Sequence, residues 1–109
     1  LLDIALDTCP WNGVTTTCES KWMNVPVIVM DGNNFSSRCG SSIIKNLNLL
    51  NLISKNKEDY IGNAVTLAQN QQMLTNLRKD LFNNALKTPL FNKTSFSNEF
   101  FSSLEKIYS

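Results

Sequence analysis

The feature that most constrains the fold is an uninterrupted apolar run from Val25 to Met30, closed by Asp31, Gly32 and Asn33. A strand with one face in solvent alternates between apolar and polar residues, and this run does not alternate. It is therefore expected to form a short strand that is covered on both faces. Strands of this kind belong to parallel sheets with helices on either side.

Segments with a helical pattern alternate with two further strand-like segments. Residues 1–6 are expected to form a first buried strand, and Trp11 to Val14 a loop. A helix should run from Thr15 or Thr16 to about Asn24, since Pro26 disfavours helix in the residue before it. The other expected elements are a helix over residues 36–47 with Asn48 as a left-handed end, a very short strand over residues 52–54, helices over residues 56–68 and 71–86, and a last helix from about Phe96 to Tyr108.

The expected helices carry apolar stripes at a spacing of three to four residues, which is typical of a face turned to a core. The stripe of the last helix is expected to pack in the core or against another domain. Lys21, in the first helix, is expected to be solvated. The stripe residues are Cys18, Trp22 and Met23, then Tyr60, Ala64, Val65 and Leu67, then Leu74, Leu77, Leu81 and Phe82, and finally Phe100, Phe101, Leu104 and Ile107.

The order of elements is β-α-β-α-β followed by helices, which predicts an α/β fold with three short parallel strands. A doubly wound nucleotide-binding domain usually has about six such strands. The sheet is therefore expected to be incomplete, with further strands before Leu1. A parallel sheet with a bare apolar edge should be poorly stable alone.

Composition excludes several classes of function. Ten Lys and Arg against nine Asp and Glu leave a net charge of +1, which favours neither nucleic acid nor an acidic membrane. Three scattered cysteines and no histidine argue against a metal site and against a disulfide scaffold, and they favour the cytoplasm. No apolar stretch approaches the roughly 20 residues of a membrane-spanning helix.

The loop and helix start from Pro10 to Glu19 carry the candidate site, because ligands of α/β sheets bind beyond the carboxyl ends of the strands. Gly13 allows a ligand to approach the backbone, and the helix start presents free N–H groups and the positive end of its dipole. Hydroxyl groups of Thr15, Thr16 and Thr17 add donors that suit a diphosphate. The two carboxylate oxygens of Glu19, one turn further on, match a pair of ribose hydroxyls.

A purely structural alternative exists for the same residues. Thr16 and Glu19 also have the spacing of a capping box, in which the two side chains satisfy backbone N–H groups at the helix start. In that case the chain would be a non-catalytic module for nucleotide sensing or protein interaction. Arg38 could reach an anionic ligand, although helix packing is the more usual role, and Cys18 is expected to be a small buried side chain.

Two longer runs carry a family resemblance. The run from Asn12 to Met30 and the run from Ser37 to Ile44 resemble the C-terminal catalytic region of glycosyltransferase family 41, the O-GlcNAc transferase and SPINDLY-like family. The resemblance covers nearly the whole chain. Further matching segments are Leu52 to Asn56, Asp59 with Tyr60, Pro89 to Phe91, and Leu104 to Tyr108.

This resemblance implies a GT-B architecture of two Rossmann-like domains with the active site in the cleft between them. Residues 1–109 would be the C-terminal portion of the nucleotide-sugar-binding domain. Family members transfer a sugar to Ser or Thr of proteins, without a metal or another cofactor. UDP-GlcNAc is the expected donor, and GDP-fucose is the alternative because Thr15 to Glu19 is close to the SPINDLY branch.

The resemblance also implies roles for individual residues. Thr15 and Thr16 would bind the donor diphosphate, Glu19 the ribose, and Asn12 and Gly13 would shape the loop. Val14, the next residue, departs from the family pattern, because the animal O-GlcNAc transferases have a histidine at this position. No catalytic residue is expected in this segment. The tetratricopeptide array that recruits acceptor proteins would precede Leu1, so the chain alone is expected to be inactive.

Overall fold

The computed structural model describes residues 2–109 and contains an open sheet of three parallel strands in the order β1-β2-β3. Ala5 is paired with Val27, and Met30 with Ser54, so that β2 lies in the middle. The predicted α/β class with three short parallel strands is confirmed. The strands are β1 (Ala5–Leu6), β2 (Val27–Met30) and β3 (Ile53–Ser54).

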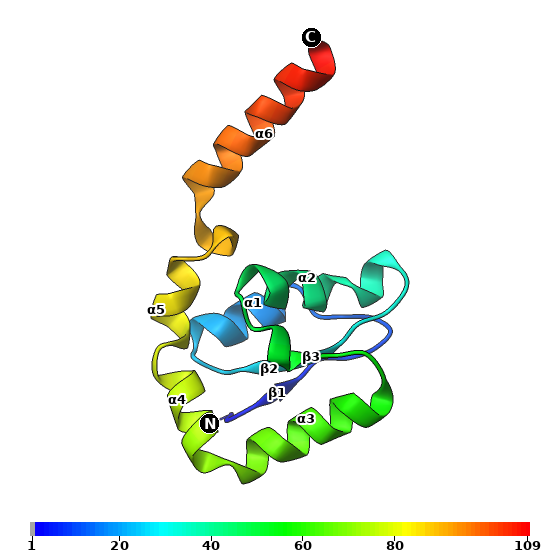
Figure 1. The fold of residues 1–109 in the computed structure, drawn as a ribbon, viewed down its shortest axis with the longest axis vertical. Helices are drawn as coiled ribbons and strands as arrows, with labels where there is room; N and C mark the ends of the chain where they lie inside the picture. The colour runs from blue at the N-terminus through cyan, green and yellow to red at the C-terminus, as the bar shows by residue number, and fades with distance from the viewer. Residues whose placement is uncertain (1) are drawn as a thin grey trace.

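Helices cover both faces of the sheet (Figure 1). In that view α1 and α2 lie above the sheet, α3 lies below it, and α4 and α5 run along one side. The α-helices are α1 (Thr15–Trp22), α2 (Cys39–Asn46), α3 (Lys57–Gln69), α4 (Gln71–Lys79), α5 (Leu81–Leu86) and α6 (Lys93–Tyr108), and the short 3-10 helices are η1 (Phe35–Ser37), η2 (Leu50–Leu52) and η3 (Pro89–Phe91).

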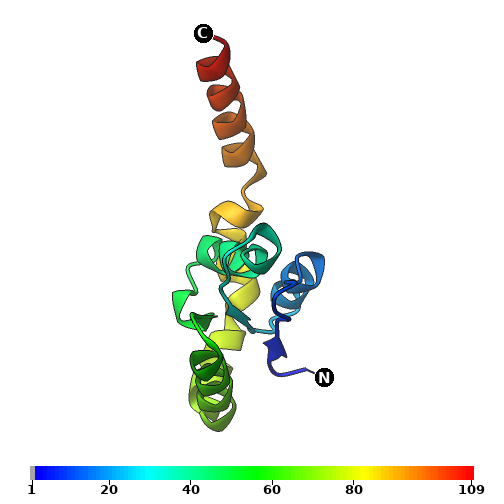
Figure 2. The same cartoon turned by 90° about the vertical axis from the view of Figure 1, so that its right-hand side faces the viewer.

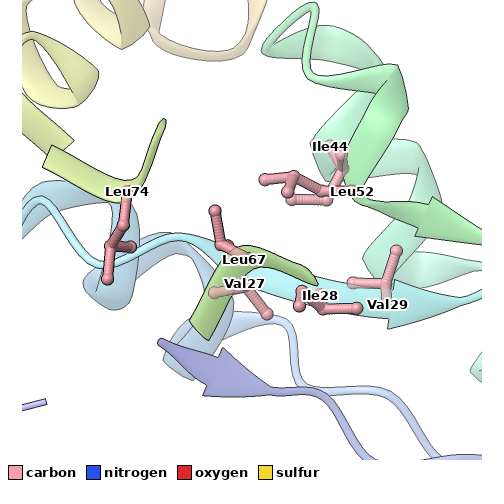
Figure 3. Packing of buried hydrophobic residues seen from close by; sticks show 7 residues of the cluster. All are labelled: Val27, Ile28, Val29, Ile44, Leu52, Leu67 and Leu74. Atoms are coloured by element: carbon pink, nitrogen blue, oxygen red, sulfur yellow. The ribbon is translucent and has the colours of Figure 1, made fainter. Parts of the chain in front are cut away.

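The core is built around β2. Ile28 and Val29 have no exposed surface, which confirms that both faces of this strand are covered. Side chains from the flanking elements complete the cluster shown in Figure 3, with Ile44 from α2, Leu67 from α3 and Leu74 from α4. The unbroken apolar run therefore reflects packing from two sides, as the sequence predicts.

Two asparagines with left-handed backbone end the helices on the upper face of the sheet. Asn48 has φ 58° after α2, which confirms its predicted role as a terminator, and Asn24 has the same φ after α1. Asparagine tolerates this conformation better than other non-glycine residues. Both helices therefore end where a local signal stops them.

The helix expected over residues 71–86 is two helices, α4 and α5, with a break at Asp80. Asp80 has φ −122° and ψ 14°, outside helical values. The N–H group of Phe82 at the start of α5 donates to Oδ1 of Asn24, 2.8 Å away. A tertiary hydrogen bond thus redirects the chain at a point where the sequence pattern alone continues.

The inward face of α1 differs from the prediction. Trp22 and Met23 were expected in the core, and they are 51% and 69% exposed. Instead Thr17 is buried and Lys21, expected to be solvated, has no exposed surface. The helix packs against α5, α2 and β2, and this contact selects the face that carries Thr17 and Lys21.

The Trp22 ring lies at the rim of this contact. It meets Phe82 of α5 edge-on, with ring centroids 4.6 Å apart, and Phe91 of η3 at 5.8 Å. Such aromatic pairs add stability without full burial of the ring. Cys18 is half-buried beside the small cluster of Ile43 and Leu47, in agreement with a packing role.

Helix α6 projects away from the sheet and its covering helices (Figures 1 and 2). It begins at Lys93, earlier than expected, because the side chain of Asn92 caps its start by accepting from Ser95 N–H at 3.0 Å. Its aromatic stripe, expected to be packed, is exposed within the described chain. Of the helices within residues 2–109, none has both the length and the apolarity needed to cross a membrane.

Candidate nucleotide-binding site at the start of α1

The loop between β1 and α1 lies beyond the carboxyl end of the sheet and is held by Asn12. The backbone N–H of this buried residue donates to Ser36 O at 2.8 Å, and its side-chain amide donates to Thr8 O at 2.8 Å. Its Oδ1 accepts from Gly40 N at 3.0 Å. The backbone of Asn12 thus connects the loop to the segment before α2, and its side chain connects the loop to α2 itself.

Gly13 occupies a position where an added side chain would displace the Thr16 hydroxyl. A Cβ atom there would lie 2.5 Å from Thr16 Oγ1 and 3.3 Å from Asp7 Oδ1. The N–H group of Gly13 donates to Asp7 Oδ1 at 2.7 Å. The loop therefore turns tightly around this glycine and enters α1 two residues later, at Thr15.

The first turn of α1 has no side-chain cap. Val14 occupies the capping position and its side chain cannot accept a hydrogen bond, and neither the Thr16 nor the Glu19 side chain bonds to the helix start. The capping-box alternative is therefore contradicted by the geometry. N–H groups at an uncapped helix start, together with the positive end of the helix dipole, favour an anion.

The predicted site residues separate into an outward and an inward set. Thr15, Thr16 and Glu19 are exposed on the side of α1 away from the core. Thr17, which the sequence also placed among the donor ligands, is 2% exposed, and its hydroxyl donates to Gly13 O at 3.0 Å. The hydroxyl of Thr17 thus supports the loop from within the fold.

A hollow of about 650 Å³ lies beside the loop, and Val14 is the one residue of the loop that borders it. Arg38 and Lys45 are both exposed and belong to its lining, which contains no carboxylate. The hollow therefore suits a neutral or anionic group. Its lining residues are Val14, Asn33, Asn34, Phe35, Arg38, Cys39, Ser41, Ser42, Ile43, Lys45 and Asn46.

Asp7 is a residue of this region that the sequence analysis missed. It follows β1 and is 9% exposed. Its Oδ1 accepts from the backbone N–H groups of Gly13 and of Thr8, the latter at 3.0 Å, while no partner for Oδ2 is found within the described chain. Burial raises the pKa of the Asp7 carboxyl, and the two backbone hydrogen bonds oppose that rise. The available signal was a charged residue directly after an apolar, strand-like segment. That segment was expected to be buried, but Ala5 is only half-buried and Leu6 is exposed, because β1 is an edge strand of the sheet in the described chain.

Comparison with known proteins identifies a family. The profile of Glycosyl transferase family 41 matches residues 1–100. A tomato (Solanum lycopersicum) protein named as a probable UDP-N-acetylglucosamine–peptide N-acetylglucosaminyltransferase SPINDLY is 39% identical over 99% of the chain, which covers 11% of that relative. The Caenorhabditis elegans UDP-N-acetylglucosamine–peptide N-acetylglucosaminyltransferase is 27% identical over 91% of the chain, which covers 9% of it.

A solved structure agrees with this assignment. A mutant O-GlcNAc transferase of Thermobaculum terrenum superposes on 97% of the chain with a TM-score of 0.89 and 32% sequence identity, and the matched part is 20% of that chain. The chain thus spans about a tenth of the length of the curated relatives it matches. Its parallel α/β fold is that of the corresponding part of a GT-B glycosyltransferase.

Proposed function

The chain belongs to glycosyl transferase family 41, and on this premise we propose that it binds the nucleotide-sugar donor of a protein O-glycosyltransferase. The observation that carries the proposal is the uncapped start of α1, from which Thr15, Thr16 and Glu19 face solvent. The N–H groups and the two hydroxyls bind the donor diphosphate. The Glu19 carboxylate accepts hydrogen bonds from the ribose hydroxyls.

The loop beneath these groups gives the site its shape. Asn12 and Gly13 hold the loop backbone close to the fold, which leaves space for a ligand to approach it. The buried Thr17 hydroxyl supports the same backbone by donating to Gly13 O. Val14 offers a ligand only its backbone and an apolar side chain, which is 50% exposed. Donor recognition by this loop therefore depends on backbone groups and on the neighbouring threonines.

The donor is UDP-GlcNAc, with GDP-fucose as the alternative. Both curated relatives described above carry UDP-N-acetylglucosamine in their names. The diphosphate is common to both donors, so the role of the helix start does not depend on the base or the sugar. No metal or other cofactor is needed in this proposal, because the helix dipole and hydroxyl donors offset the charge of the diphosphate.

The contribution of this site to catalysis is electrostatic. Negative charge grows on the diphosphate as the sugar leaves for a Ser or Thr hydroxyl of the acceptor protein. Donors already fixed at the helix start stabilise that charge without reorganisation. The groups that hold the acceptor and remove its proton are proposed to lie outside the chain, whose activity requires the rest of the enzyme.

The proposal is tested by Thr16→Val and Glu19→Gln in the full-length protein. Thr16→Val should lower kcat/KM roughly 100-fold, since a donor to the leaving group is lost. Glu19→Gln should weaken UDP binding by about tenfold, because a charged acceptor becomes neutral. Sugar transfer to a Ser-containing peptide and calorimetric titration with UDP measure the two effects.

Matched controls lie on α3, on the other side of the sheet. Thr66 and Glu58 are exposed there, and Thr66→Val and Glu58→Gln should leave both measurements unchanged. Wild-type values for both site variants would disprove the proposed site. Binding of UDP that depends on Glu19, in a protein that never transfers sugar, would instead favour a non-catalytic nucleotide-binding module.

A further inference from the structure

We propose that Asp7 is a positioning residue that fixes the donor loop through the N–H group of Gly13. This inference rests on the proposed function, since it assigns a supporting residue to the same site. Asp7 touches no part of the outward-facing set of Thr15, Thr16 and Glu19 in the described hydrogen bonds. Its effect on the donor is therefore indirect and passes through the loop.

The Asp7 carboxylate lies between the starts of two helices. Oδ1 accepts from Gly13 N at 2.7 Å, two residues before α1 begins. Oδ2 lies so close to Gly40, in the first turn of α2, that a Cβ atom on Gly40 would overlap it. The Asp7 side chain thus fixes the distance between the loop and the sheet through Oδ1. Its other oxygen, Oδ2, lies against Gly40 of α2.

The backbone of Asp7 is anchored from two further directions. Its N–H group donates to Ile28 O of the central strand at 3.0 Å. Its carbonyl oxygen accepts from the Tyr60 hydroxyl of α3 at 2.7 Å. The hydrogen bond to the central strand fixes the Asp7 backbone, and the carboxylate then holds Gly13 from that position. The Tyr60 hydroxyl bonds to the carbonyl oxygen, so its contribution is to stability and not to the position of the carboxylate.

Stability alone does not account for a carboxylate at this position. Oδ2 is buried and has no hydrogen-bond partner among residues 2–109, which is a cost for the folded state. What the carboxylate contributes is an acceptor for the Gly13 N–H, 2.7 Å away, inside the fold beneath the loop. The order that the carboxylate gives to the loop accounts for its presence at such a cost.

The test compares three variants of the full-length protein. Asp7→Ala removes the acceptor, Asp7→Asn retains an acceptor oxygen, and Tyr60→Phe removes the other side-chain hydrogen bond to the same residue. Asp7→Ala should weaken UDP binding by about tenfold, a typical effect of one charge-assisted hydrogen bond. Asp7→Asn should restore most of the affinity, and Tyr60→Phe should lower Tm while UDP binding stays at the wild-type level.

Calorimetric titration with UDP, repeated with GDP, and thermal unfolding give both readouts. A lower Tm in Asp7→Ala with wild-type affinity for the nucleotide would overturn the inference, as would an equal loss of affinity in Tyr60→Phe. If Asp7→Ala does not fold, Asp7→Ser takes its place, because its shorter hydroxyl cannot reach Gly13 N. Wild-type affinity in Asp7→Ser would likewise overturn it.

The same titrations separate this inference from the proposed function. If the Thr16 and Glu19 variants lose affinity and the Asp7 variants do not, only the role of Asp7 fails. If the wild-type protein binds neither UDP nor GDP, the proposed function is wrong, and the role proposed for Asp7 is wrong as well.

Discussion

Lys21 is a lysine without exposed surface whose Nζ has no hydrogen-bond partner in the described chain. No acid lies on the elements that pack against its helix: α5 and β2 carry no charged residue, and α2 carries only Lys45, which is exposed. Burial without a counter-charge lowers the pKa of Lys21 from 10.5 to about 7. Near neutral pH this side chain therefore passes between charged and neutral forms inside the fold.

This pKa makes the stability of the chain depend on pH. Above pH 7 the unfolded chain still holds the Lys21 proton and the folded chain has released it, so the free energy of unfolding rises with pH. The slope is expected to approach about 1.4 kcal/mol per pH unit as the pH rises from 7 to 8.5, because the folded chain is half protonated at its pKa and almost fully deprotonated at pH 8.5. Below the folded pKa both states hold the proton, and this contribution to the slope vanishes. Urea unfolding at pH 6, 7 and 8.5 measures the slope.

Lys21→Met should remove that slope and raise the free energy of unfolding at pH 7 by about 1–3 kcal/mol, because an apolar chain of similar length replaces a desolvated amine. Lys45→Met, at an exposed position of α2, is the control and should retain the slope. Identical pH profiles for wild type and Lys21→Met would show that Lys21 is solvated in the folded protein.

At the scale of elements, Asn24 and Asn48 share φ 58° and differ in what their side chains do. Asn24 Oδ1 accepts from Phe82 N at 2.8 Å, and its carbonyl oxygen accepts from Arg78 Nε at 3.0 Å. Asn48 is exposed, and no side-chain hydrogen bond of its own is found in the described chain. Asn24 thus joins α1 to α4 and α5, whereas Asn48 only ends α2.

Substitution by glycine separates these two roles, since glycine keeps the left-handed backbone and removes the side chain. Asn24→Gly should lower the free energy of unfolding by about 1–2 kcal/mol, because Phe82 N–H loses its acceptor. Asn48→Gly should change it by less than about 0.5 kcal/mol. Urea unfolding of both variants measures the difference, and equal losses would contradict the connecting role of Asn24.

The elements that the sequence predicts correctly are those with local causes. The unbroken apolar run identifies β2, and Asn48 identifies the end of α2. The errors arise where distant contacts decide. The break at Asp80 depends on a hydrogen bond to Asn24, and the inward face of α1 depends on packing against α5, neither of which periodicity can show.

The candidate site divides in the same way. Glycine, threonine and acid at a helix start are visible in the sequence, because the geometry of that start fixes their relation. The role of Asp7 cannot be read from the sequence, because it depends on tertiary contacts. Gly13 must fold back onto the Asp7 carboxylate, and Gly40 must approach it from α2. The inward turn of Thr17 likewise follows from the face of α1 that the sheet selects.

At the scale of the whole molecule, the described chain is elongated, with extents of 54 × 31 × 19 Å and a radius of gyration of 15.3 Å. A compact domain of this length would have a radius of gyration of about 13 Å. The excess comes from α6, which projects beyond the packed helices and buries none of its residues. Its exposed large apolar residues are Phe96, Phe100, Phe101, Ile107 and Tyr108.

An exposed aromatic stripe on a projecting helix should make the isolated chain associate, because contact between such surfaces removes apolar area from water. We expect the weight-average mass in sedimentation velocity to increase with concentration. Replacing Phe96, Phe100 and Phe101 by Ser should suppress the increase, since these three rings form a contiguous set with neighbouring centroids 5.9 Å apart. Phe35→Ser, on a ring that is 88% exposed in η1, should leave the increase in place. Association that persists in the triple variant would show that another apolar surface is responsible. The next residues to change would be the exposed Leu2, before β1, and Leu6, the last residue of β1.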